Sequence, residues 1–286
     1  MTTSDAAFAI AHPLLDAAMP SPAWTNLGCW QRRDGTPITH YADAAKQLAA
    51  RVGEAAISAT GQCVADLGCG HGASLLLWQH RFAAACVIGI ELQAACVTGW
   101  QQHARDGISL HQGRFDQLPL SATIAASLPT GGADAVVCVD AVVCVDAAYH
   151  ADSLGAFAAV AQKLLRPQGR FAFTTVLRPA RSSLGGQIKQ RLLMRLSGIP
   201  AASFVSAEEL ERTLARLGFD GIRIEYLDSE VLQGFADFVA RRAGELPMSQ
   251  RRSLAWLKIA ATGAMCQHWF GRQELRYVLV SATRTG

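Results

Sequence analysis

The sequence predicts an α/β fold: a doubly wound, seven-stranded, mostly parallel sheet with helical cap insertions. Three observations predict it. From Gln62 onward, short apolar runs rich in β-branched residues alternate with helical patterns, a glycine-rich turn links the first run to a helix, and a carboxylate ends the second run. This alternation is typical of βαβ units that build a parallel sheet.

Composition limits the classes of protein to consider. The chain has 286 residues, half of them hydrophobic and 17% charged, so it is long enough to bury a sizeable core. A formal net charge of +3 falls short of the basic stripe of a nucleic-acid binder, which favours a small-molecule partner and no nucleic acid. The sequence does not define an oligomeric state.

The eight cysteines form no CxxC pair, and the histidines show no metal-ligand spacing. We therefore expect buried free thiols, no metal and a cytoplasmic location. No uncharged apolar run reaches the roughly 18 residues of a membrane span, and no basic stretch precedes the apolar patch near the N-terminus. We expect no stable membrane insertion.

The apolar runs give seven predicted strands, all parallel except the last. Their mostly continuous apolar character indicates strands covered on both faces. They span Cys63 to Leu67, Cys86 to Glu91, Ile108 to Gln112, part of Asp134 to Asp146, Gly169 to Val176, Gly221 to Leu227 and Leu275 to Ala282.

Helical patterns occupy the stretches between these runs. Ser206, followed three residues later by Glu209, forms a capping box that marks one helix start. The predicted helices span Tyr41 to Ala56, Ala73 to Arg81, Gln93 to Arg105, Asp152 to Leu165 and Ala207 to Leu217.

Three stretches stand outside the alternation. Residues 1–60 are expected to form an N-terminal lid segment, and residues 61–286 the main domain. Within that domain we expect cap insertions at about 178–203 and 229–272, the second as two helices interrupted near Pro247. The first insertion contains a basic amphipathic helix, and its polar face either meets an anionic acceptor or a membrane surface or is simply solvated.

A six-residue unit, Ala-Val-Val-Cys-Val-Asp, occurs twice in tandem, as Ala135 to Asp140 and as Ala141 to Asp146. A strand through both copies would be about 36 Å long at roughly 3.3 Å per residue, about twice the usual length. Because six is even, a slip between copies keeps every side chain on its face. We expect the second copy to form the fourth strand and the first to bulge out before it.

The most informative stretch is Val64 to Ser74, in which an apolar strand runs into glycines spaced two apart and then into a helix. Glycines there permit positive φ and let a ligand approach bare backbone, and free amides at a helix start favour an anionic group. Glu91 ends the next strand, where a carboxylate accepts hydrogen bonds from both ribose hydroxyls. The pattern predicts a nucleoside site, the alternative being a structural turn.

These motifs resemble those of class I S-adenosylmethionine-dependent methyltransferases. The resemblance is closest to the small-molecule branch, the methyltransferase type 11 domain, which includes ubiquinone/menaquinone, tocopherol, sterol and sugar O-methyltransferases. It covers about Asn26 to Arg284, with family motifs similar to Asp66 to Gly72, to Glu91 and to Leu164 to Gly169. It implies a Rossmann-like fold, S-adenosyl-L-methionine as cofactor, and methyl transfer to oxygen, nitrogen or carbon of a small metabolite or natural product.

The resemblance also implies roles for single residues. The glycine turn would hold the methionine part of the cofactor, Glu91 the ribose and Leu92 the adenine. Arg114 stands where the family usually has an aspartate, and a guanidinium accepts no hydrogen bond, so Asp116 is an alternative contact to the adenine. The implied cofactor-binding residues are Asp66, Gly68, Cys69, Gly70, Gly72, Glu91, Leu92, Arg114, Phe115 and Asp146.

For catalysis, the branch commonly places an acidic residue after strand four and a histidine four residues later, which matches Asp146 and His150. We expect His150 to act as the catalytic base; the alternative is a hydrogen-bonding or packing role. Trp30 and Tyr41, near a family-like Asn-Leu-Gly-Cys-Trp segment, and Tyr149 are the expected substrate-binding residues, with core packing as the alternative for the first two.

Two other functions stay open. A methyltransferase acting on a macromolecule is disfavoured by the modest charge and by the absence of an Asn-Pro-Pro-Tyr-type motif after strand four. A non-catalytic S-adenosylmethionine-binding or regulatory protein, disabled by the repeat, is the third possibility. The sequence does not identify the methyl acceptor.

Overall fold

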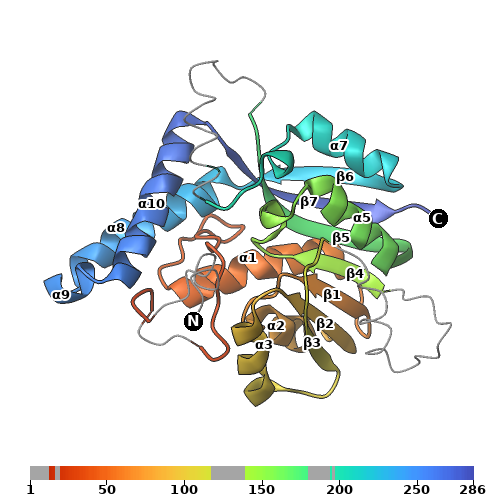
Figure 1. Cartoon of the computed structure of the whole chain (residues 1–286), viewed down its shortest axis with the longest axis horizontal. Helices are drawn as coiled ribbons and strands as arrows, with labels where there is room; N and C mark the ends of the chain where they lie inside the picture. The colour runs from red at the N-terminus through yellow and green to blue at the C-terminus, as the bar shows by residue number, and fades with distance from the viewer. Residues whose placement is uncertain (1–12, 17–19, 117–138, 180–193, 195–196) are drawn as a thin grey trace.

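The computed structural model describes residues 13–16, 20–116, 139–179, 194 and 197–286. Its centre is a seven-stranded sheet with the strand order β3-β2-β1-β4-β5-β7-β6 (Figure 1). The strand β7 runs antiparallel to both neighbours, and the other neighbouring pairs are parallel. The strands are β1 (Cys63–Leu67), β2 (Cys86–Glu91), β3 (Ile108–Gln112), β4 (Val139–Cys144), β5 (Leu165–Leu177), β6 (Phe219–Tyr226) and β7 (Arg276–Arg284).

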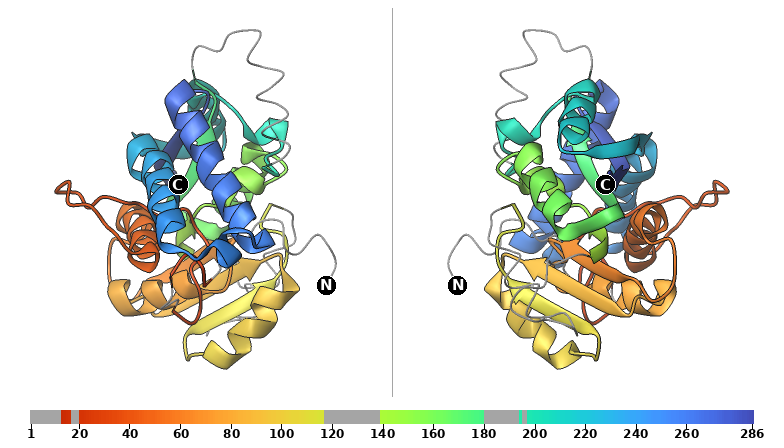
Figure 2. Two further views of the ribbon diagram at one scale, coloured as in Figure 1. Left: turned by 90° about the vertical axis from the view of Figure 1, so that its left-hand side faces the viewer. Right: turned by 90° about the vertical axis from the view of Figure 1, so that its right-hand side faces the viewer.

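Helices cover both faces of the sheet, as the apolar strands predicted. Alternate strand residues pack into two separate cores, one under α1 and α2 and the other under α5 and α7. Figure 2 shows α1 and α5 on opposite sides of the sheet. The helices that flank the sheet span Tyr41–Ala56 (α1), Ala73–Phe82 (α2), Ala94–Trp100 (α3), Leu154–Leu164 (α5) and Ala207–Arg216 (α7).

The chain between β6 and β7 forms a helical layer at the carboxyl edge of the parallel strands. It begins with a π-helical turn (Asp228–Gln233) and continues as α8 (Gly234–Glu245), α9 (Met248–Arg251) and α10 (Leu254–Arg272). Pro247 is the N-cap residue of α9. Proline is tolerated there because its missing amide hydrogen removes no hydrogen bond within the helix. Figure 1 shows these helices on the same side of the sheet as the N-terminal segment, and buried aromatic residues of both belong to one core.

The predicted fold class is confirmed, and β1, β2, β3 and α1 have the predicted bounds. The structure corrects several other ends. The helix predicted over Gln93 to Arg105 is α3 followed by a 3₁₀ turn, Gln101–His103, and β5 starts at Leu165 instead of Gly169. The capping box of α7 is present, with Ser206 and Glu209 each accepting the other's amide. Residues 180–193, 195 and 196, within the first predicted cap insertion, lie outside the described residues.

The second copy of the repeat supplies the fourth strand, as predicted. Ala141 to Val143 pair with β1, and the last two residues of the first copy, Val139 and Asp140, begin the strand. Asp140 accepts a hydrogen bond from the Cys63 amide at 2.7 Å and pairs with Arg166. The remainder of the first copy, 135–138, lies outside the described residues. No helix in the described part of the chain is long and apolar enough to cross a membrane.

Deletion of residues 135–140 should preserve the sheet. The deletion joins Asp134 to Ala141, so Asp134 takes the place of Asp140 and Ala133 takes the place of buried Val139. We expect a loss of about 1–2 kcal/mol from the smaller side chain, with cofactor affinity equal to that of the full chain or better. Thermal unfolding and calorimetric titration measure both quantities. Loss of cooperative unfolding or of cofactor binding would show that both copies are needed.

Candidate functional site

The glycine turn between β1 and α2 brings bare backbone to a cavity of about 230 Å³ at the carboxyl ends of β1, β2 and β4. Gly68, Gly70 and Gly72 have φ values of 81°, 57° and 88°, a region that favours glycine. A Cβ on Gly68 would lie 2.6 Å from Ala147, and one on Gly70 would lie 2.8 Å from the Thr25 hydroxyl. Gly68 and Gly70 line the cavity, whereas Gly72 precedes α2 and packs against Trp100.

Two other residues of the motif support the turn from beneath. Asp66 is fully buried and accepts hydrogen bonds from the Ser74 hydroxyl at 2.6 Å and the Trp78 indole at 2.7 Å. Burial raises its pKa to about 6, although these two hydrogen bonds oppose the rise. Cys69 is also buried, with its sulfur against Gly89 of β2. Neither side chain reaches the cavity wall, so both fix the turn to α2 and the sheet.

Glu91, at the end of β2, lines the cavity next to the glycine turn. Its carboxylate accepts the Gly70 amide at 2.9 Å through one oxygen and the Gln93 amide at 2.9 Å through the other. A carboxylate has about four acceptor positions, so both oxygens can still accept hydrogen bonds from a ligand. Leu92 lies at the rim of the cavity with 48% of its surface exposed. The Gly70–Glu91 hydrogen bond therefore adds to the bonds from the Gly68 and Cys69 amides to the Ile90 carbonyl, and it leaves the acidic group available.

Three residues just after β3 in the chain, Arg114 to Asp116, form another part of the cavity wall. Arg114 forms a bidentate pair with Asp116, with distances of 3.1 and 2.9 Å, and reaches Asp152 at 2.7 Å. Asp116 also accepts the Asp152 amide at 2.6 Å. Phe115 packs against Gly68 and, edge-on, against Phe157. Both Arg114 and Asp116 line the cavity, and their mutual pairing neutralises most of the charge on this wall.

Asp146 joins four separate parts of the chain at the end of β4. One carboxylate oxygen accepts the Leu27 amide at 2.7 Å, and the other accepts the hydroxyls of Tyr149 and Tyr277, each at 2.8 Å. The amide of Asp146 donates to the Thr174 hydroxyl at 2.7 Å. Burial raises the pKa of Asp146, and its three hydrogen bonds lower it. Asp146 thus fixes the N-terminal segment against the sheet.

His150 lies in a 3₁₀ turn, Ala148–His150, and lines the cavity. Its Nδ1 is 3.0 Å from the carbonyl oxygen of Gly198. A carbonyl only accepts, so Nδ1 carries the proton and Nε2 is the basic nitrogen of the neutral ring. Burial lowers the pKa of His150, while the Gly198 carbonyl and the Asp146 carboxylate raise it. The net lowering keeps the imidazole neutral at pH 7.

The structure does not place Trp30, Tyr41 or Tyr149 on the wall of this cavity. Trp30 stacks on Phe238 at 4.4 Å and donates to the Leu27 carbonyl at 2.9 Å. Tyr41 is fully buried, and its hydroxyl donates to the Asn26 carbonyl at 2.8 Å. The hydroxyl of Tyr149 is bonded to Asp146. These aromatic residues hold the N-terminal segment and the loop after β4 in position, and their role in substrate binding stays a prediction.

Several cavity residues were not selected from the sequence as site residues. They are neighbours of selected ones in the chain, and this adjacency is the signal that could have found them. Asn26 starts the segment that contains Trp30, Gln93 and Cys96 follow Glu91, and Val145 and Ala147 flank Asp146. The cavity residues not selected are Thr25, Asn26, Gln93, Cys96, Val145 and Ala147, whereas Asp116 was named from the sequence as an alternative adenine contact.

Comparisons with known proteins agree with this geometry. A curated relative, erythromycin 3''-O-methyltransferase of Saccharopolyspora erythraea, is 24% identical over 228 residues, which are 77% of this chain and 69% of the relative. Among solved structures, mycolic acid cyclopropane synthase CmaA1 with bound S-adenosylhomocysteine matches with a TM-score of 0.73 and 13% identity, over 98% of this chain and 96% of that one.

A third match is geranyl diphosphate C-methyltransferase from Streptomyces coelicolor A3(2), also with bound S-adenosyl-L-homocysteine. It has a TM-score of 0.71 and 17% identity, over 96% of this chain and 94% of that one. These likenesses confirm the Rossmann-like fold. A family model described as a methyltransferase domain matches residues 38–224, more than half of the chain. The chain therefore belongs to the methyltransferase-domain family, and the enzyme class expected from its sequence is confirmed.

Proposed function

We propose that this methyltransferase transfers the methyl group of S-adenosylmethionine to an oxygen, nitrogen or carbon atom of a small metabolite or natural product. The observation that carries the proposal is the cavity with bare backbone at Gly68 and Gly70 and an acidic group at Glu91. The similar proteins support both the cofactor and the class of acceptor, because two hold S-adenosylhomocysteine and the third is an erythromycin 3''-O-methyltransferase.

The residues present fit a nucleoside with an amino-acid tail. The carboxylate of Glu91 is suited to accept the two ribose hydroxyls, and Leu92 and Phe115 offer apolar surface to a flat base. Gly68 and Gly70 allow the tail to approach the main chain without meeting a Cβ. When bound, S-adenosylmethionine supplies a methyl group on a positively charged sulfur.

Methyl transfer needs an acceptor atom held in line with that methyl group, and positioning alone can lower a barrier by about 7–11 kcal/mol. An acceptor that must lose a proton also needs a base. His150 lines the cavity, and its neutral ring has Nε2 as the basic nitrogen. We propose that His150 takes this proton and that Asp146, through its charge, stabilises the imidazolium that forms.

Isotope transfer tests the function directly. We expect the protein, incubated with methyl-labelled S-adenosylmethionine and a fractionated metabolite extract, to label at least one small molecule, as detected by mass spectrometry.

The Glu91→Gln variant tests the cofactor site. It should bind the cofactor about 10–100-fold more weakly, because it lacks the charge that strengthens hydrogen bonds to the ribose. Glu211→Gln on α7 is the matched control. Cofactor binding without any labelled product would favour a non-catalytic binding protein.

The pH profile tests His150. Because burial lowers its pKa from the ordinary 6.5, we expect kcat/KM to be flat above about pH 6.5 and to fall at lower pH as the ring is protonated. His150→Gln should lower kcat by about 10²–10⁴-fold and abolish the acidic limb. His80→Gln, at an exposed position of α2, should change neither. Full turnover of His150→Gln with an unchanged profile would exclude the base.

The Asp146→Asn variant tests the attachment of the N-terminal segment. Asparagine tolerates the φ of 59° at this position, so the change affects mainly the hydrogen bonds. Loss of the charged acceptor should cost about 1–3 kcal/mol and speed hydrogen exchange of the Leu27 amide. Asp220→Asn, at an exposed position of β6, is the control. Unchanged protection of the Leu27 amide in Asp146→Asn would contradict this role.

A further inference from the structure

A second and larger cavity, of about 500 Å³, lies on the α1 side of β5, β7 and β6. It contains residues near the start of β6 and the end of the antiparallel β7, so it opens toward the amino edge of the parallel strands. It shares no lining residue with the cavity at their carboxyl ends. Its polar lining includes Arg33, Arg51, Arg170, Arg223, Ser281 and Thr283.

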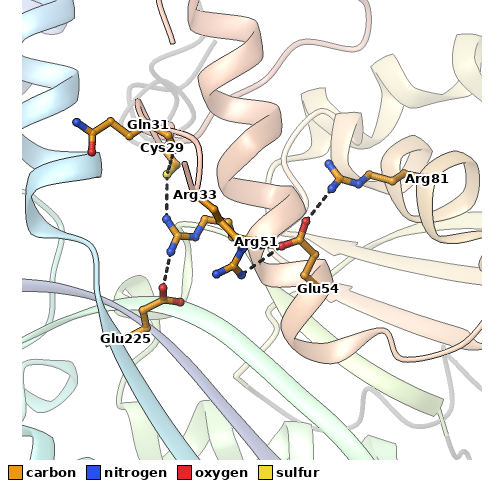
Figure 3. A network of polar contacts seen from close by, with 7 residues as sticks. All are labelled: Cys29, Gln31, Arg33, Arg51, Glu54, Arg81 and Glu225. Carbon is orange, nitrogen blue, oxygen red and sulfur yellow. Dashed lines mark hydrogen bonds and ion pairs between the residues drawn. The ribbon is translucent and has the colours of Figure 1, made fainter. Parts of the chain in front are cut away.

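The lining carries an excess of positive charge. Four arginines line this cavity, against two glutamates, Glu54 and Glu225. Figure 3 shows how the glutamates are used: Glu54 lies between Arg33, at 3.2 Å, and Arg81, at 2.7 Å, while Glu225 pairs with Arg51. Both carboxylates are therefore already paired with Arg33, Arg51 or Arg81, and neither pairs with Arg170 or Arg223.

Arg51 is a buried cation, with 6% of its side chain exposed. Its guanidinium lies between the Glu225 carboxylate and the Cys29 sulfur, to which Nη1 is 3.6 Å (Figure 3). Its Nε is buried without a hydrogen-bond partner. A buried charge gains from further compensating negative charge, so Arg51 favours an anion in the adjacent space.

The other two lining arginines, Arg170 and Arg223, lie on the strands of the sheet. Arg170 of β5 pairs in register with Thr283 of β7, and Arg223 of β6 pairs with Ser281 of the same strand. Because neighbouring strands are about 4.8 Å apart, these arginines stand on either side of the two hydroxyl residues. Neither guanidinium has a hydrogen bond or ion pair with another residue in the described part of the chain.

We propose that this cavity is a binding site for a small multivalent oxyanion, an organic phosphate or polycarboxylate. The planar fork of each arginine matches the two oxygens of such a group, and two forks separated by a strand suit a ligand with two acidic groups. The hydroxyls of Ser281 and Thr283 add donors between them. Leu279 also lines the cavity, on the same face of the sheet, and offers apolar contact to a carbon skeleton.

Calorimetric titration at constant ionic strength tests the proposal, with inorganic pyrophosphate and citrate as separate probes of phosphate and carboxylate. We expect saturable binding of at least one probe, weakened at least tenfold in the Arg170→Gln, Arg223→Gln double variant. The Arg251→Gln, Arg252→Gln double variant removes the same charge at exposed positions of α9 and just beyond it, and it should bind as the unmodified protein does. Affinity for S-adenosylhomocysteine should be equal in all three proteins.

Three results would overturn the site. They are the absence of saturable binding for both probes, equal weakening in both double variants, and competition of the probe with S-adenosylhomocysteine for one site. The first two identify a solvated arginine cluster that acts only through net charge. The third places the probe in the cofactor cavity. Because the probes do not depend on methyl transfer, failure of the proposed function leaves this test intact.

Discussion

The hydrogen bond from the Gly70 amide to the Glu91 carboxylate is the contact on which the candidate site depends. It joins the turn after β1 to the end of β2 and fixes an acidic group beside bare backbone on the cavity wall. The turn can make this contact because Gly70 adopts a positive φ and carries no Cβ next to Thr25. Asp66, buried under the turn, holds the start of α2 through Ser74 and Trp78 and so keeps the amide in place.

Asp146 performs a second joining task at the end of β4. Its carboxylate accepts hydrogen bonds from the N-terminal segment, from the loop that carries His150 and from β7. A partly buried carboxylate with three donors loses stability when any of them moves away. The position of His150 in the cavity therefore depends on contacts between segments far apart in the sequence. The tandem repeat leaves this arrangement intact because its second copy, which ends in Asp146, forms the strand.

The parts of this structure predicted from sequence are those with local causes. The strands β1 and β2 are mostly apolar runs with clear ends, and Gly68, Gly70 and Glu91 follow from the turn chemistry of one βαβ unit. Contacts between residues far apart in the chain could not be predicted from local sequence patterns. Leu27 and Tyr277 are 119 and 131 residues from Asp146, and a buried aromatic such as Tyr41 has the same pattern whether it packs or binds. The pairing of Arg170 and Arg223 with β7 required the register of antiparallel strands.

The most direct test of the central claim is a crystal structure of the protein with S-adenosylhomocysteine. The account predicts the nucleoside in the cavity at the carboxyl ends of β1, β2 and β4, with both ribose hydroxyls within hydrogen-bond distance of Glu91 and the amino-acid tail along Gly68 and Gly70. A ligand bound elsewhere, or a ribose without contact to Glu91, would contradict it.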